Sequence, residues 1–176
     1  MIKLLLVLCF SIALVADSLN IKNGVLKAHT EMMMDSNIDP INKNLHAHLT
    51  IRENDLTTIE GVFWVEMNMF ASDESDRDEA MHESIKSSVH KLAIYKIFSV
   101  TKTEIKDIYE INGVLSFQGI DKDLVAEAKI VQEMDSMSIN ATTSMQFSDY
   151  GIEMPCLLFM CVDDMVDLNI QASFDK

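Results

Sequence analysis

The segment Asp164–Phe174 constrains the fold more than any other stretch, because apolar and polar side chains alternate along it without interruption from Val166 onward. In an extended strand, successive side chains point to opposite faces of the sheet. One face of this strand is therefore dry and the other wet, which is typical of antiparallel sheets rather than of parallel sheets buried on both sides. The dry face consists of Val166, Leu168, Ile170, Ala172 and Phe174.

Seven further segments show a similar alternation, in places only roughly, and are predicted strands. They are Gly24–Met34, Leu45–Arg52, Ile59–Phe70, Leu92–Thr103, Asp107–Gln118, Asp121–Glu133 and Ser136–Phe147. Eight long antiparallel strands, each with one dry face, close naturally into a barrel that leaves no free edge. The predicted fold class is therefore all-β with one short helix, arranged as an eight-stranded antiparallel β-barrel. At that strand number the interior is filled by side chains or holds one small ligand.

The helix is predicted within the polar segment Ser72–Val89, which interrupts the strands. Ser72, Asp73 and Ser75 are good N-cap residues, and acidic residues suit the first turn of a helix. Met81, Ile85 and Val89 recur every four residues and predict one apolar stripe.

Residues 1–16 have the pattern of a secretory signal peptide. Lys3 supplies a positive start, Leu4–Val15 an apolar core and Ala16 a small residue for cleavage; cleavage after Ala13 is an alternative. Twelve apolar positions are too few to span a bilayer. We therefore expect an exported, periplasmic protein whose mature domain is residues 17–176, with no stable membrane insertion after processing.

The acidic balance of the chain limits its partners. The formal charge is −14, and removal of Lys3 with the signal peptide makes it −15. This charge argues against nucleic acid as a partner and against electrostatic docking on anionic lipid. Only five glycines and two prolines are present, so no linker and no second domain are expected.

Three segments carry more than periodicity: Ser72–Ser84, Ile111–Lys122 and Met145–Pro155. In order and spacing they resemble the YceI-like family of exported lipid-binding proteins. Arg77-Asp78-Glu79 lies in the first segment and is similar to the Arg-Asp-Glu start of that family's short helix. Gly113, Leu115 and Gly119 match its Gly-x-Leu-x-x-x-Gly strand and turn. The third segment contains a turn, 148–151, similar to its Ser-Asp-Phe-Gly turn, with Tyr150 in place of Phe.

The resemblance implies a lipocalin-like barrel that encloses an isoprenoid or another long apolar chain, and a protein that is often a homodimer. This sequence departs from the family pattern at two places. Gln118 stands where the family usually has His, and Tyr95-Lys96 stands where it usually has Tyr-Pro.

The dry faces of the third, fifth, seventh and eighth predicted strands are expected to line the ligand cavity. The predicted lining residues are Phe63, Val65, Met67, Leu115, Phe117, Ile139, Met145, Leu168 and Ile170. Met67 and Met69 are predicted to share the dry face of the third strand, and Met137 and Met145 that of the seventh. Methionine side chains adapt to varied apolar shapes and so suit a flexible ligand. The expected ligand is an isoprenoid, a quinone tail, or a fatty amide or acid, bound with weak head-group selectivity. No other cofactor is expected.

Two alternative functions remain open on the sequence. An enzyme acting on a lipid in the same cavity would need an ionisable group inside, and the dry faces carry almost none; no catalytic residues are assigned. A metal-binding stress protein would use His46 and His48, which share one face of a strand. That face is the wet one, so solvated histidines are favoured and no metal site is assigned.

Cys156 and Cys161 are the only cysteines that follow the signal segment. An even pair in an oxidising compartment favours a disulfide. Two buried free thiols or a redox pair are the alternatives.

Overall fold

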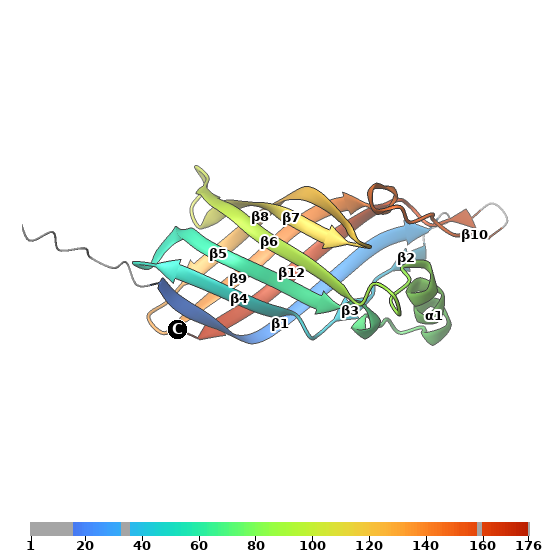
Figure 1. Cartoon of the computed structure of the whole chain (residues 1–176), viewed down its shortest axis with the longest axis horizontal. Helices are drawn as coiled ribbons and strands as arrows, with labels where there is room; N and C mark the ends of the chain where they lie inside the picture. Colours follow the sequence, from blue (N-terminus) through green and yellow to red (C-terminus); the bar gives the residue numbers. More distant parts are fainter. Residues whose placement is uncertain (1–15, 33–35, 158–159, 176) are drawn as a thin grey trace, which may run out of the picture.

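The computed structural model of the chain describes residues 16–32, 36–157 and 160–175. Eight long strands form most of it (Figure 1). They are β1 (Ala16–Met32), β4 (His46–Arg52), β5 (Asp55–Glu66), β6 (Leu92–Lys102), β7 (Ile108–Phe117), β8 (Ile120–Gln132), β9 (Ser136–Gln146) and β12 (Met165–Asp175). Apart from Ala16, with which β1 begins, the predicted signal peptide lies outside the described residues.

The strands close into a barrel. They follow one another in the order β12-β9-β8-β7-β6-β5-β4-β1, and every pair is antiparallel. Pairing of β1 with β12, with Ala28 opposite Leu168, completes the ring. The predicted all-β, eight-stranded antiparallel barrel is confirmed.

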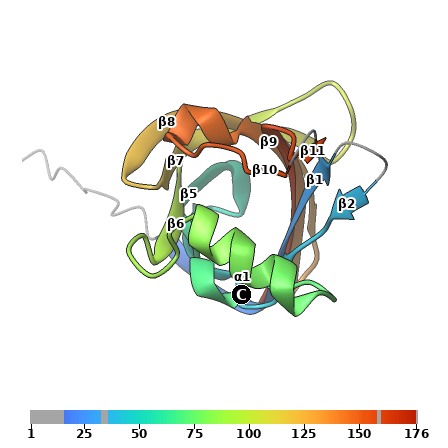
Figure 2. The same cartoon turned by 90° about the vertical axis from the view of Figure 1, so that its right-hand side faces the viewer.

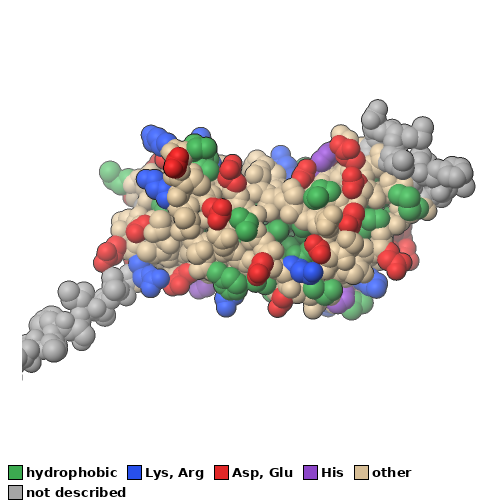
Figure 3. All heavy atoms as spheres, turned by 90° about the horizontal axis from the view of Figure 1, so that it is seen from above, with side chains coloured by type: hydrophobic (Ala, Val, Ile, Leu, Met, Phe, Trp, Pro, Cys, Tyr) green, Lys and Arg blue, Asp and Glu red, His purple; other side chains and the backbone are tan. Residues whose placement is uncertain are grey.

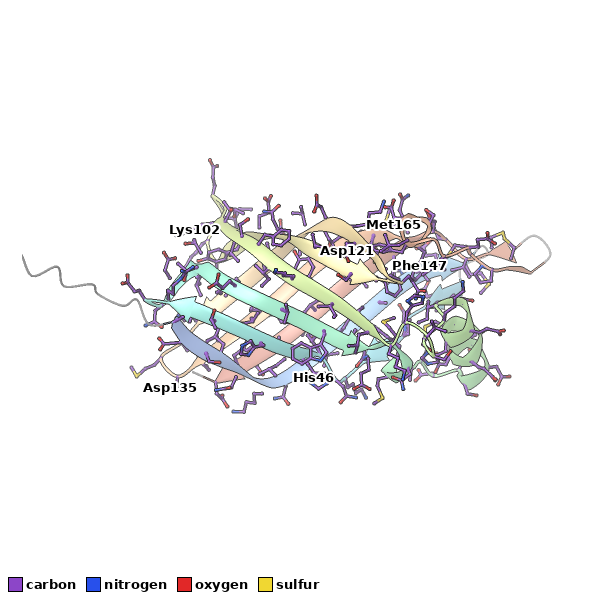
Figure 4. The ribbon with its side chains drawn as sticks, in the orientation of Figure 1. His46, Lys102, Asp121, Asp135, Phe147 and Met165 are labelled. Carbon is purple, nitrogen blue, oxygen red and sulfur yellow. A yellow bond between two sulfur atoms is a disulfide. The ribbon has the colours of Figure 1, made fainter. Side chains whose placement is uncertain are left out.

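The smaller elements gather at one end of the barrel, opposite the end where the chain terminates (Figures 1 and 2). The one α-helix among the described residues, α1 (Ser75–Ser84), lies across part of this opening. The others are β2 (Ser36–Ile38), β3 (Ile41–Asn42), β10 (Cys156–Leu157), β11 (Met160–Cys161) and the 3₁₀ turns η1 (Met67–Met69) and η2 (Phe147–Tyr150). In Figure 4, Phe147 and Met165 lie near this end, whereas Lys102 and Asp135 mark the other.

The first strand is longer than the sequence predicts. It begins at Ala16 rather than Gly24, because Ala16–Leu19 pair with β4 and Leu19 is only 2% exposed. Further along, β1 pairs with β12, β3 and β2 in turn. The end predicted for this strand, Met33 and Met34, lies outside the described residues.

Two other boundaries correct the sequence prediction. Strand β5 ends at Glu66 rather than Phe70, because Met67 turns out of the sheet and donates its N–H to the carbonyl of Lys91. The same-face prediction for Met67 and Met69 is therefore wrong: Met67 is buried, and Met69 is 44% exposed.

Helix α1 is shorter than predicted. Ser72 is not its N-cap; its N–H and its hydroxyl both donate to the carboxylate of Asp78, at 2.9 and 2.7 Å. The helix ends at Ser84, so the expected stripe stops at Ile85 and Val89 is 71% exposed. The remaining strand boundaries agree with the sequence prediction to within one residue, apart from the start of β5 at Asp55.

The half of the barrel far from α1 is filled with side chains. The rings of Phe63 and Phe174 meet edge to face, with centroids 6.3 Å apart. Around them lie aliphatic residues with 2% exposure or less: Leu19, Leu49, Ile51, Ile130, Met137 and Ile139. This packed half stabilises the barrel, so the other half need not be filled as densely.

Candidate functional site

The half of the barrel under α1 contains an apolar cavity of about 230 Å³. Strands β1, β5, β6, β7, β9 and β12 supply its walls, and one side of α1 supplies its cover. Among its apolar lining residues are Leu26, Ala28, Val65, Met67, Phe70, Met81, Ile85, Ala93, Leu115, Phe117, Met145, Phe147, Ile152, Met154, Val166 and Leu168. A cavity with such a lining repels water and favours an apolar guest.

Six of the nine predicted lining residues lie on this cavity: Val65, Met67, Leu115, Phe117, Met145 and Leu168. The other three point into the barrel but do not reach the cavity. Phe63 packs against Phe174, Ile139 is 1% exposed beside Ile130, and Ile170 packs against the buried core. They belong to the packed half because neighbouring side chains already fill the space in front of them. Contact of any of the nine with a ligand stays a prediction.

The cavity ends at a row of three neighbouring residues, one on each of β5, β6 and β7, and this row forms its floor. Phe63, Tyr95 and Leu115 are register neighbours on β5, β6 and β7, and of these only Leu115 lines the cavity. The Tyr95 hydroxyl lies 3.0 Å from the carbonyl oxygen of Ile111 and 2.9 Å from that of Leu124. Burial raises the pKa of the Tyr95 phenol, so it stays neutral and in place as a hydrogen-bond donor.

The turn 148–151, which is similar to the Ser-Asp-Phe-Gly turn of the family, supports the cavity wall rather than contributing reactive groups. The ring of Tyr150 packs edge to face on Phe117 with centroids 5.3 Å apart. Ser148 donates from both its N–H and its hydroxyl to the carboxylate of Asp164. Gly151 ends η2 with a φ of 69°, a conformation that glycine adopts without strain.

The C-terminal end of helix α1 is hydrogen-bonded to the barrel. The hairpin between β7 and β8 turns at Gln118 and Gly119, both with positive φ (54° and 75°). The side-chain amide of Gln118 donates to the carbonyl of Ile85, which caps α1. Gln118, a departure from the family pattern, therefore links this hairpin to the cover of the cavity.

Three polar side chains also line the cavity. The hydroxyl of Thr30 donates to the carbonyl of Met165 at 2.9 Å, and that of Ser84 donates to the carbonyl of Ala80 at 2.8 Å. The third is Arg77, which is not among the nine predicted lining residues. A signal was present: Arg77, Ala80, Met81 and Ser84 share one helix face by their spacing.

The two histidines considered for a metal lie on the barrel wall outside the cavity. His46, labelled in Figure 4, stacks on the ring of Trp64 with centroids 5.3 Å apart. His48 is exposed. Within residues 16–32, 36–157 and 160–175, no three His, Cys, Asp or Glu side chains are grouped so that they could hold a metal ion.

Cys156 and Cys161 face each other on β10 and β11 and are joined by a disulfide. This hairpin projects from the end of the barrel that α1 covers (Figure 1).

Among the described residues, no helix has the length and apolar character needed to cross a membrane.

Comparison with known proteins agrees with this architecture. The family model described as the YceI-like domain matches residues 18–174. None of the curated proteins matches the chain. Among solved structures, BcnA of Burkholderia cenocepacia superposes with a TM-score of 0.75 at 9% identity, covering 85% of this chain and 95% of that one.

Two further structures have the same fold. A polyisoprenoid-binding domain from Saccharophagus degradans, implicated in plant cell wall breakdown, gives a TM-score of 0.68 at 9% identity over 93% of this chain and 99% of its own. A YceI protein of Campylobacter jejuni gives 0.70 at 15% identity over 82% and 88%. At such identities the likeness shows the fold alone.

Proposed function

This chain belongs to the YceI-like domain family, and from that premise we propose that it is an exported, non-catalytic carrier of a long apolar chain. An isoprenoid, a quinone tail, or a fatty amide or acid would lie with its tail in the barrel. The single observation that carries the proposal is the cavity under α1, whose lining is almost wholly apolar. The Saccharophagus domain, described as polyisoprenoid-binding, adds support by its shared fold.

The cavity suits the tail of such a ligand energetically. Burial of one methylene contributes about 0.8 kcal/mol, so one five-carbon isoprene unit contributes on the order of 3–4 kcal/mol before ordering costs. A cavity of about 150 Å³ is enough for benzene, and drug-sized ligands occupy about 300–1,000 Å³. The 230 Å³ present here therefore encloses part of a long chain. Flexible Met67, Met81, Met145 and Met154 in the lining can move to admit more.

The enzyme alternative has little support at this site. Among the lining residues that the structure describes there is no carboxylate, imidazole or thiol, and Arg77 is the one titratable side chain. The two lining hydroxyls, those of Thr30 and Ser84, both donate to backbone carbonyls. Asp78, one of the acidic residues of α1, accepts hydrogen bonds from Ser72 and so holds the start of the helix. The metal-binding alternative has even less support, since His46 stacks on Trp64 outside the barrel.

Export to the periplasm rests on the signal-like sequence of residues 1–16, and homodimer formation rests on the resemblance alone. A nucleic-acid partner is not proposed, because the chain is strongly acidic and its acidic side chains are spread along the face seen in Figure 3.

A charge-insertion experiment tests the carrier function. Leu168→Glu places a carboxylate in the apolar cavity, whereas Val125→Glu places one on the outside of the barrel, where Val125 is 51% exposed. We expect Leu168→Glu to abolish binding of the apolar fluorophore diphenylhexatriene, because an unpaired buried carboxylate is costly. Val125→Glu should bind it as the unaltered protein does. Equal binding by the two variants would contradict the proposal.

A further inference from the structure

Arg77 is the one charged side chain among the described residues that line the cavity. Helix α1 places it on the cavity together with Ala80, Met81 and Ser84. Because these residues recur at three- and four-residue spacing, one helix face covers the opening and Arg77 lies toward its N-terminal end. A ligand tail in the barrel would therefore bring its head group to the level of α1.

The contacts of Arg77 leave one of its three side-chain nitrogens without an acceptor. One terminal nitrogen, Nη2, lies 2.6 Å from a carboxylate oxygen of Glu74, and the other, Nη1, donates to the carbonyl of Asn37 at 3.1 Å. The third nitrogen, Nε, is buried and has no acceptor among the residues described. Thr30 and Ser84, the other polar lining residues, both donate to backbone carbonyls.

A buried N–H without an acceptor is rare in native structures and costs free energy, so such a group indicates a missing partner. Arg77 lines the α1 end of the cavity, so an acceptor atom of a ligand bound there is the candidate partner. Neither an apolar tail nor a second donor meets this need.

The charges around Arg77 define the acceptor further. Its single positive charge is already paired with Glu74, and α1 also carries Asp76, Asp78 and Glu79 nearby in sequence. A second carboxylate or a phosphate beside this guanidinium would add negative charge to an acidic region. A neutral carbonyl oxygen accepts the Nε–H without that repulsion.

We infer that Arg77 anchors the head group of the ligand: its Nε–H donates to a neutral carbonyl oxygen, as in an amide, an ester or a quinone, while the tail occupies the cavity. The inference rests on the proposed carrier function and adds head-group recognition to it. It also changes the expectation from sequence that head-group selectivity is weak.

Displacement of diphenylhexatriene by three probes with the same twelve-carbon chain tests it: dodecanamide, dodecanoate and dodecane. Arg77→Met is compared with Arg52→Met, since the chain has only these two arginines and Arg52 lies on the surface near Glu60. We expect the amide to displace the fluorophore about tenfold better than the alkane in the unaltered protein and in Arg52→Met. Arg77→Met should bind both equally.

The outcomes separate the two claims. If diphenylhexatriene and dodecane fail to bind the unaltered protein, the carrier function itself is wrong. If they bind but the amide has no advantage, or keeps its advantage in Arg77→Met, the anchor role of Arg77 is wrong and the carrier function stands. A preference for dodecanoate over dodecanamide that disappears in Arg77→Met would overturn the neutral head group. Loss of dodecane binding along with the amide in Arg77→Met would show that Arg77 only holds the helix in place, and would likewise overturn the anchor.

Discussion

Gly113 on β7 lies against the ring of Tyr95 on β6 so closely that a β-carbon at position 113 would be 2.6 Å from Cζ of that ring. The same β-carbon would be 2.4 Å from the carbonyl oxygen of Lys96, closer than real contacts allow. The first glycine of the family-like motif thus makes room for the tyrosine that marks the cavity floor.

Gly113→Ala should therefore destabilise the protein. The added methyl group must push the Tyr95 ring off its two carbonyl partners or move β6, which overpacks the barrel at a cost of about 1–3 kcal/mol or more. Urea unfolding measures the change. Gly119→Asn is the matched control, because Asn tolerates the positive φ at that turn and a β-carbon there would meet His90 only at an ordinary contact distance, 3.6 Å. Similar stability losses in both variants would contradict this account of Gly113.

The division of the barrel into a packed half and a hollow half predicts unequal costs for two similar truncations. Ile139→Ala removes a side chain that is 1% exposed in the packed half, and should cost about 2–5 kcal/mol. Leu115→Ala enlarges a space that already exists, so its cost should be smaller. Both values come from urea unfolding. Equal costs would mean that the two residues have equally dense surroundings.

The ion pair between His29 and Asp39 predicts a pH dependence of stability. Nδ1 of His29 lies 2.6 Å from the Asp39 carboxylate. This hydrogen bond, aided by the charges of Asp39, Glu31 and Asp167, outweighs partial burial and raises the pKa of His29 above 6.5. A raised folded-state pKa stabilises the protein fully below the unfolded-state value, and the effect is lost as pH rises through the folded-state value.

Asp39→Asn should accordingly reduce stability at pH 5 to 6 and have little effect at pH 9. An NMR titration should also show that the pKa of His29 falls in this variant. Asp121→Asn, on another part of the surface (Figure 4), serves as the control for loss of one acidic charge. An unchanged His29 titration in Asp39→Asn would show that the pair does not form in solution.

The cysteine pair makes a prediction that follows from compartment and geometry together. Exported protein that has been denatured without reductant should not react with a thiol reagent. After reduction, two reactive thiols per molecule should appear. Closing so short a loop contributes about 2 kcal/mol on the loop-entropy estimate, so Cys156→Ser with Cys161→Ser should lower stability by roughly that amount. Two reactive thiols without reductant would contradict the disulfide.

The sequence was sufficient for the fold because alternation is strongest where one face of a strand is buried. It could not show where the chain leaves the sheet at the end of a strand. Met69 continues the alternation of β5, yet lies in a 3₁₀ turn. Val89 likewise keeps the helix spacing after the helix has ended. Such ends depend on tertiary hydrogen bonds, for example that from Met67 to Lys91, which no local pattern encodes.

The cavity could be predicted only in part, for a related physical reason. Alternation tells which side chains point inward, but how deeply the barrel is filled depends on the volumes that meet there. Phe63 and Leu115 have the same inward pattern, and Phe174 fills the space before the first of them only. Arg77 was missed because it stands in a run of charged residues that is normally solvated.

The most direct test of the central claim is mass spectrometry of an organic extract from protein exported and purified without detergent. We predict a single-chain apolar compound in the extract, in a ratio approaching one per protein molecule, and its absence from Leu168→Glu prepared in the same way. The contrary result is an extract free of lipid from unaltered protein that also fails to bind isoprenoid or long acyl probes at micromolar concentration. The cavity under α1 would then have no role in carrying a ligand.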